Sequence, residues 1–96
     1  MIKHIVMWKF KDDVTEADML EMKRQLEALK GVVPSLVDIE IGMDVSSKEA
    51  SMDMVLYSEF QTLEDLAAYA GHPEHLKVVE FVKPLVCDRA VVDYQI

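Results

Sequence analysis

Two of the three histidines in the chain lie three positions apart, with a proline between them. His72 and His75 enclose Pro73 and Glu74 in the stretch YAGHPEH, which begins at Tyr69. A neutral imidazole can take a proton from an acidic carbon, and a phenol can donate a hydrogen bond to an oxygen of the same substrate. The stretch therefore has two interpretations: a general-base site, or a simple bend between two helices.

The residues around the histidines predict one helix that ends and a second that begins. Gly71 ends the first helix, and Pro73 suits the first position of the next, because a backbone N–H there has no partner within the helix. His72 then occupies the cap position, and His75 lies about one turn further on, near the partly positive end of the helix. A positive environment favours the neutral imidazole, which is the form that a general base needs.

The third histidine, His4, lies on a predicted strand whose alternation places it on the same side as Trp8. If this side faces the helices, both side chains line one pocket with Tyr69 and the imidazoles of the break. The alternative is structural, with His4 and Trp8 as core residues and His72 as a helix cap.

Neither a metal nor an organic cofactor is expected. His72, Glu74 and His75 have a spacing that suits a metal, but no acidic cluster has a defined position to complete the site. Cys87 is the only cysteine, so there is no thiolate pair, and we expect it to be a small buried side chain. The three glycines are far apart, so no P-loop or dinucleotide fingerprint is present.

The composition is typical of one compact domain, which we place at residues 1–96. The chain is 51% hydrophobic, and its 96 residues suffice for one core but not for two. Its 18 acidic and 10 basic residues give a net charge of −8 without any basic run, so nucleic acid is not an expected partner. No apolar stretch is long enough for a signal peptide or a membrane span, so we expect a cytoplasmic protein without a membrane partner.

The hydrophobic periodicity predicts the order strand, helix, strand, strand, helix pair, strand. The strands are expected at 2–10, 37–43, 52–60 and 86–96, and the helices at 15–31, 62–71 and 73–84. This order is the split β-α-β motif of a ferredoxin-like α+β fold, βαββαβ, with its second helix split at Gly71-His72-Pro73. In the helix before the break, the residues expected on the buried side are Leu63, Leu66, Ala67 and Ala70.

Three of the predicted strands carry apolar residues on both faces, whereas the helices can cover only one face of the sheet. An exposed apolar sheet face is hard to maintain in a monomer. Two sheets that face each other across a two-fold axis would cover it. We therefore expect a homodimer with a barrel-like centre.

The chain resembles the stress-responsive A/B barrel domain (Dabb) family from about His4 to Tyr94. The resemblance rests on the start HIVMWKFK, the strand DMVLYSEF, the stretch AYAGHPEHLKVV and the terminal VVDY. Its most specific part is the H-P-x-H-L motif after the second helix, together with a histidine on the first strand. The resemblance implies a dimeric α+β barrel.

The family includes plant polyketide cyclases that close a linear polyketide thioester by an aldol condensation without a cofactor. Carried over to this chain, the resemblance implies that His75 is the base and that Tyr69 anchors the substrate. It implies supporting or positioning roles for His72 and His4. Small residues flank the motif where those enzymes carry bulkier ones, so the identity of the substrate stays open.

Three functional hypotheses follow. The first is a cofactor-free cyclase or lyase that acts on a polyketide-like or β-dicarbonyl compound, with substrate-binding contributions from His4, His72 and Trp8. The second is a non-catalytic stress-response dimer that binds a small hydrophobic ligand or a protein. The third, suggested by related dimeric α+β barrels, is a cofactor-independent monooxygenase.

Overall fold

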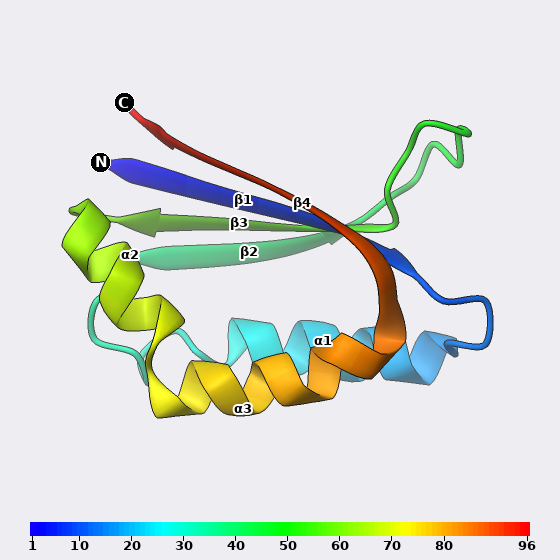
Figure 1. Ribbon diagram of the computed structural model, residues 1–96, viewed down its shortest axis with the longest axis horizontal. Helices are drawn as coiled ribbons and strands as arrows, with labels where there is room; N and C mark the ends of the chain where they lie inside the picture. The colour runs from blue at the N-terminus through cyan, green and yellow to red at the C-terminus, as the bar shows by residue number, and fades with distance from the viewer.

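The computed structural model describes all residues of the chain, 1–96. It contains three α-helices and four strands in the order that the sequence predicts (Figure 1). Their bounds are β1 Ile2–Phe10, α1 Glu16–Glu27, β2 Asp38–Met43, β3 Met54–Phe60, α2 Leu63–Ala70, α3 Pro73–Val82 and β4 Val86–Gln95, with a single 3-10 turn at Lys83–Leu85.

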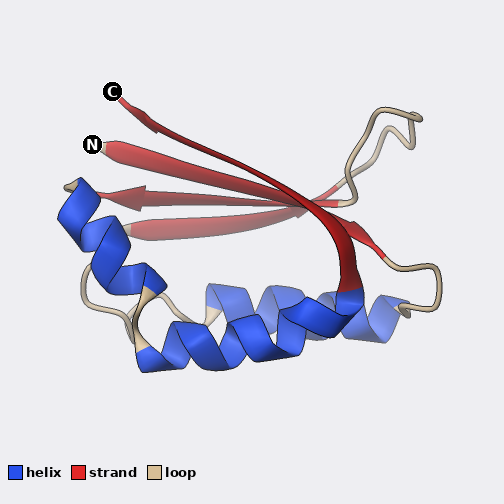
Figure 2. Ribbon diagram, in the orientation of Figure 1, coloured by secondary structure: helices blue, strands red, loops and turns tan.

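The strands form one antiparallel sheet in the order β2-β3-β1-β4. All the helices lie on the same face of this sheet, and the other face is uncovered (Figure 2). The ferredoxin-like α+β fold is thus confirmed, and the second helix is divided into α2 and α3. Because β1 is central, His4 lies opposite Ser58 of β3 on one side and opposite Asp93 of β4 on the other.

The first helix begins where the sequence predicts and ends earlier. Thr15 and Asp18 form a capping box, in which each side chain accepts a hydrogen bond from the backbone N–H of the other. The helix ends at Glu27 with Ala28 as its C-cap, because the N–H groups of Leu29 and Lys30 bond to carbonyls three residues back and tighten the chain into turns. Gly31 takes a positive φ of 84° in these turns rather than at the helix end itself.

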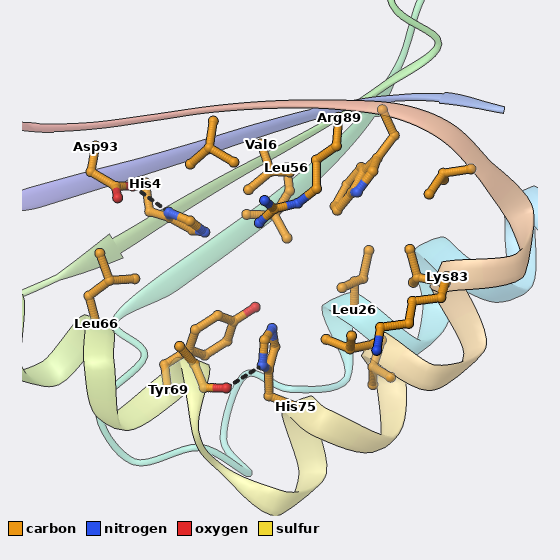
Figure 3. Close-up of a pocket in the computed structure, with 17 residues that line it drawn as sticks. His4, Val6, Leu26, Leu56, Leu66, Tyr69, His75, Lys83, Arg89 and Asp93 are labelled. Carbon is orange, nitrogen blue, oxygen red and sulfur yellow. Dashed lines mark hydrogen bonds and ion pairs between the residues drawn. The ribbon is translucent and has the colours of Figure 1, made fainter.

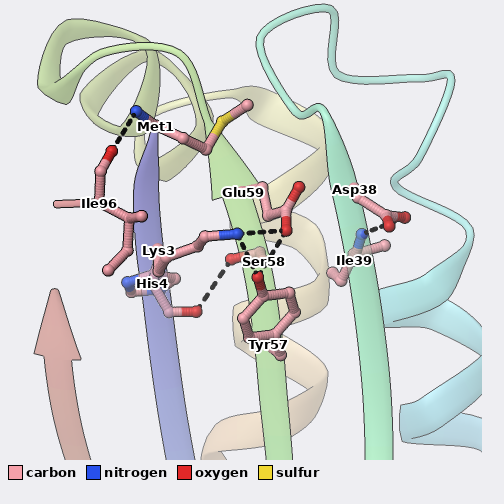
Figure 4. A network of polar contacts seen from close by, with 9 residues as sticks. All are labelled: Met1, Lys3, His4, Asp38, Ile39, Tyr57, Ser58, Glu59 and Ile96. Carbon is pink, nitrogen blue, oxygen red and sulfur yellow. Dashed lines mark hydrogen bonds and ion pairs between the residues drawn. The ribbon is translucent and has the colours of Figure 1, made fainter. Parts of the chain in front are cut away.

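The hydrophobic core lies between the sheet and the helices. The face of β1 that carries Val6 and Trp8 is buried, as the alternation predicts, and shares one apolar cluster with Met22 and Leu26 of α1. Burial of each such side chain stabilises the fold by about 1.5–3 kcal/mol. Ser58 is the one buried polar residue, and its hydroxyl donates to the backbone carbonyl of His4 at 3.2 Å (Figure 4).

The prediction for the buried side of α2 is confirmed for Leu66, which packs against the core, and is wrong for its other three residues. Leu63 is 64% exposed, and Ala67 and Ala70 are also exposed, whereas Tyr69 is only 1% exposed. α2 is short and lies across one end of the sheet, so that only a narrow stripe of it reaches the core (Figure 1). Leu66 and Tyr69, three residues apart, form that stripe.

The expectation that Cys87 is buried is also wrong, since it is exposed. Cys87 lies at an irregularity in the pairing of β1 with β4, which is an edge strand. A side chain at such a site has no second strand or helix to cover it. Its thiol lies 3.6 Å from the backbone oxygen of Phe10.

The uncovered face of the sheet is partly apolar. Val92 is 52% exposed and Tyr94 is 42% exposed, and Met7 on β1 is also exposed. On the same face, the ammonium group of Lys3 donates to the hydroxyl of Tyr57 at 2.6 Å and to the carboxylate of Glu59 at 2.7 Å (Figure 4). Separately, none of the helices is both long and apolar enough to span a membrane.

Candidate functional site

A cavity of about 600 Å³ lies between the sheet and the helices (Figure 3). Twelve of the 17 residues that line it are hydrophobic, and Tyr69, whose ring carries a polar hydroxyl, is one of the twelve. Its polar and ionisable lining comes from β1, β4, α2 and the region around α3, and consists of His4, Tyr69, His75, Lys83, Arg89 and Asp93. A mostly apolar cavity with a few converging polar groups is the usual form of a small-molecule site.

The break between α2 and α3 is formed as the sequence predicts. α2 begins at the cap residue Thr62 and ends at Gly71, and Pro73 is the first residue of α3. His72 is the N-cap of α3, and its Nδ1 accepts a hydrogen bond from the backbone N–H of Glu74 at 3.1 Å. His72 does not line the cavity. It fixes the start of the helix that carries the next histidine, and a role in substrate contact stays a prediction.

His75 lines the cavity with one ring nitrogen already engaged. Its Nδ1 lies 3.0 Å from the backbone oxygen of Ala70. Because a carbonyl oxygen can only accept, Nδ1 carries the hydrogen and Nε2 keeps its lone pair. Figure 3 shows Nε2 directed into the cavity. The neutral imidazole is therefore held in the tautomer whose proton-accepting nitrogen, Nε2, faces the cavity.

The pKa of His75 is lowered from its ordinary value, mainly because burial disfavours the charged ring. The hydrogen bond to Ala70 acts in the opposite direction, and electrostatic interaction with His4 and then with Arg89 lowers the pKa further. A neutral ring is what the sequence predicts, but the expected cause was the helix terminus. The largest cause is desolvation.

Tyr69 lies beside His75, with the two ring centroids 4.4 Å apart. Its hydroxyl is buried and has no hydrogen-bond partner. Burial also raises the pKa of Tyr69 above the ordinary value, so the phenol keeps its proton and can donate it in a hydrogen bond. Because an unpartnered buried hydroxyl costs about 1–3 kcal/mol, this group is a natural donor for a ligand oxygen in the cavity.

His4 faces the cavity from the sheet, with its ring centroid 6.5 Å from that of Tyr69. Its Nδ1 donates to the carboxylate of Asp93, its neighbour across the two strands. This pairing fixes the ring and leaves Nε2 as the nitrogen without an assigned partner. Trp8, also predicted at the site, lines the cavity and is buried.

Sequence reasoning missed three charged residues of the lining. Arg89 and Asp93 lie on β4 on the same side as Val91, which also lines the cavity, and Lys83 follows α3. The alternation of β4 contains the signal, because residues 89, 91 and 93 share one face. That signal becomes readable only once the pairing of β4 with β1 is known.

Nowhere in the chain do three or more His, Cys, Asp or Glu side chains gather in a way that could hold a metal ion.

Comparison with known proteins identifies the family. Residues 2–96 match the family model described as Stress responsive A/B Barrel Domain. The chain is 36% identical over 98% of its length to a stress-response A/B barrel domain-containing protein of Arabidopsis thaliana, and it spans only 36% of that protein. It is 31% identical to olivetolic acid cyclase of Cannabis sativa, over 78% of this chain and 76% of the cyclase.

A solved structure agrees with these relationships. The crystal structure of a dimeric protein of unknown function and ferredoxin-like fold from Bacteroides fragilis is 33% identical to the chain, with a TM-score of 0.84. The similarity covers 99% of this chain and 95% of that one. The family model and the fold thus agree over almost the whole length, and the chain belongs to the stress-responsive A/B barrel domain family.

Proposed function

We propose that this protein is a homodimer that binds a small, largely apolar carbonyl compound in the cavity and acts on it as a cofactor-free cyclase or lyase. One observation carries the proposal. The Nε2 lone pair of His75 and the unpartnered hydroxyl of Tyr69 lie on the same wall of an otherwise mostly apolar cavity. A free acceptor beside a free donor is the pair that proton abstraction next to a carbonyl requires.

In the proposed reaction, His75 Nε2 removes a proton from a methylene between two carbonyl groups. The electron pair of the broken C–H bond moves onto a carbonyl oxygen, and Tyr69 donates a hydrogen bond to the resulting enolate. The imidazolium is stabilised by the Nδ1–H bond to the Ala70 carbonyl. The enolate carbon then attacks a second carbonyl of the same chain, and the new alkoxide takes the proton back from His75.

The relatives support this class of reaction. One of them is named a cyclase and matches about three quarters of this chain. The substrate class, a polyketide-like or β-dicarbonyl compound, is part of the proposal. The cavity offers space and apolar surface for such a compound, but its volume does not distinguish between members of this class. His4, held by Asp93, is proposed to position the carbonyl group from the sheet side.

The homodimer is supported by the uncovered sheet face and by the dimeric relative from Bacteroides fragilis. Burying Val92 and Tyr94 against a second copy would remove apolar surface from water. Lys3, Tyr57 and Glu59 lie on the same face and form hydrogen bonds to one another (Figure 4). Because these polar groups are already paired, burying them against a second copy carries a smaller desolvation cost.

Deuterium exchange tests the reaction most directly. A linear β-oxo thioester is incubated with the protein in deuterated buffer, exchange at its acidic methylene is followed by NMR, and ring-closed product is sought by mass spectrometry. His75→Ala is expected to lower the protein-dependent exchange rate by about 10²–10⁴-fold. Lys77→Ala, on an exposed position of the same helix, is the matched control.

Unchanged exchange in His75→Ala would contradict the proposal. If the thioester shifts the His75 ring resonances but neither exchange nor product is seen, the protein is a ligand-binding dimer without turnover. Oxygen uptake with a quinol as the substrate would instead favour the monooxygenase hypothesis.

A further inference from the structure

Arg89 places a fixed positive charge in the cavity. The residue lies on β4 opposite Trp8 of β1, and both line the cavity. Figure 3 shows the side chain of Arg89 extending from the sheet into the cavity, toward the side where His75 lies. The positive charge of Arg89 is also one of the causes that lower the pKa of His75, so it acts on the proposed base.

This guanidinium has no acidic partner. None of the six ion pairs in the molecule includes Arg89. Asp93 is the one acidic residue in the lining, and His4 occupies its carboxylate. Lys83, the other cation of the lining, lies 3.5 Å from Glu80. In a chain of net charge −8, the cavity lining thus holds one cation without an acidic partner.

Arg89 is an exposed residue, so its guanidinium stays hydrated without a ligand, and the apolar lining beside it would strengthen its pairing with an anion that enters the cavity. Its planar fork of N–H donors fits the two oxygens of a carboxylate. The apolar lining fits the remainder of such a molecule. These features select a ligand with one anionic end and an apolar body.

We propose that the cavity binds a monocarboxylate with an apolar body, whose carboxylate pairs with Arg89, and that Arg89 sets this specificity. The inference rests on the proposed function only in that the same cavity holds the ligand. It narrows the carbonyl compound described above to an acid such as an oxo acid. The carboxylate pairs with Arg89 on the sheet side, and the apolar body then extends toward His75 and Tyr69 on the helix side.

A matched pair of probes tests this inference. Phenylacetate and phenylacetamide have nearly the same shape, and only the first is charged. Binding of each is measured by NMR titration, with the His75 ring and the Arg89 Nε–H as reporters. The protein is expected to bind phenylacetate about tenfold or more tightly than phenylacetamide. Phenylacetate, but not phenylacetamide, is expected to raise the pKa of His75, because it neutralises Arg89.

Three variants test whether Arg89 causes the preference for phenylacetate over phenylacetamide. Arg89→Gln is expected to reduce phenylacetate affinity to that of phenylacetamide and to leave phenylacetamide affinity unchanged. Arg89→Lys, which keeps the charge without the planar fork, is expected to retain part of the preference. Arg24→Gln is the matched control, since Arg24 is the only other arginine and lies on an exposed face of α1, paired with Glu21. Circular dichroism confirms that each variant folds.

Equal affinities for the two probes, absence of binding by both, or a preference that survives Arg89→Gln would each overturn the inference. These outcomes are distinct from failure of the proposed reaction. If phenylacetate and phenylacetamide bind equally well and both perturb the His75 resonances, the inference fails, but the proposal that His75 abstracts a proton is not contradicted. If the preference for phenylacetate depends on Arg89 but the protein catalyses no deuterium exchange, the inference stands and the proposed reaction is rejected.

Discussion

Tyr69 and His75 lie with ring centroids 4.4 Å apart although they belong to two different helices. In one uninterrupted helix, residues six positions apart would be separated by about 9 Å along the axis and by about 120° around it. Their side chains would then diverge. The end of α2 at Gly71 and the restart at Pro73 turn the second helix, so that both rings reach the same cavity.

The same break explains the tautomer of His75. The carbonyl of Ala70 is in the last turn of α2, where helix carbonyls lack partners within the helix. His75, in the first turn of α3, satisfies it through Nδ1. The bend and the candidate site are therefore one feature, and the two interpretations of YAGHPEH do not exclude each other.

The pH dependence of proton abstraction should follow the lowered pKa of His75. The rate is expected to be constant above pH 6.5 and to fall only as the pH drops through the pKa of the folded protein, which lies below 6.5. Deuterium exchange measured between pH 4.5 and about 8 checks this. A midpoint above 6.5 would contradict a base whose charged form is disfavoured by burial.

The free energy of unfolding should show the same titration. The folded pKa of His75 is lower than the unfolded one, so the unfolded chain binds the proton more readily between the two values. Stability is therefore fully present above about pH 6.5 and decreases as the pH falls through the folded pKa. Urea unfolding of the protein and of His75→Gln at several pH values isolates this contribution, since the variant lacks it.

Tyr69→Phe should separate stability from activity. The hydroxyl that it removes is buried and unpartnered, so the variant is expected to be as stable as the parent or more stable by about 1 kcal/mol. Exchange should nevertheless fall by about tenfold or more, because the enolate loses its donor. Thermal unfolding and the exchange rate are measured on the same samples.

Tyr57→Phe is the matched control for this substitution. The hydroxyl of Tyr57 accepts from Lys3 and donates to Glu59 on the other face of the sheet, away from the cavity. Its removal should therefore lower stability and leave exchange unchanged. A marked loss of stability in Tyr69→Phe would mean that its hydroxyl has a partner in the folded protein.

Much of the fold follows from local rules of the sequence. Alternation along 2–10 assigns the buried face of β1, and Thr15 and Pro73 mark helix starts, because each rule depends only on neighbours in the chain. The site is predicted less completely. His4, Trp8, Tyr69 and His75 all reach the cavity, but His72 turns to cap its own helix.

The two β4 residues that sequence reasoning missed can be assigned to the site only from long-range strand pairing. Arg89 and Asp93 matter because the register places them opposite Trp8 and His4, and the spacing along β4 alone does not reveal that pairing. Leu63, Ala67 and Ala70 were wrongly placed on the buried face of α2, since how a short helix crosses the sheet is set by packing rather than by its own periodicity.

Substitutions of His72 distinguish a cap from a substrate contact. His72→Ala removes the acceptor for the N–H of Glu74 and should cost about 1 kcal/mol of stability, whereas His72→Asn can still cap the helix and should restore most of it. Chemical unfolding measures both. If His72→Asn recovers stability but not exchange, the imidazole itself contributes to the site, as the family resemblance implies; recovery of both assigns it a structural role.

The uncovered sheet face should control assembly. Val92 is 52% exposed and lies on β4 opposite Ile5 of β1, so a charge at this position would be desolvated in a sheet-to-sheet interface. Light scattering should give twice the 11.0 kDa chain mass for the parent protein and the single-chain mass for Val92→Asp. Leu20→Asp changes a side chain that is 54% exposed on α1, on the opposite side of the molecule, and should remain dimeric. If Val92→Asp keeps the dimer mass, the two copies contact each other through another surface. If the parent protein has the single-chain mass at micromolar concentration, the proposed dimer is rejected.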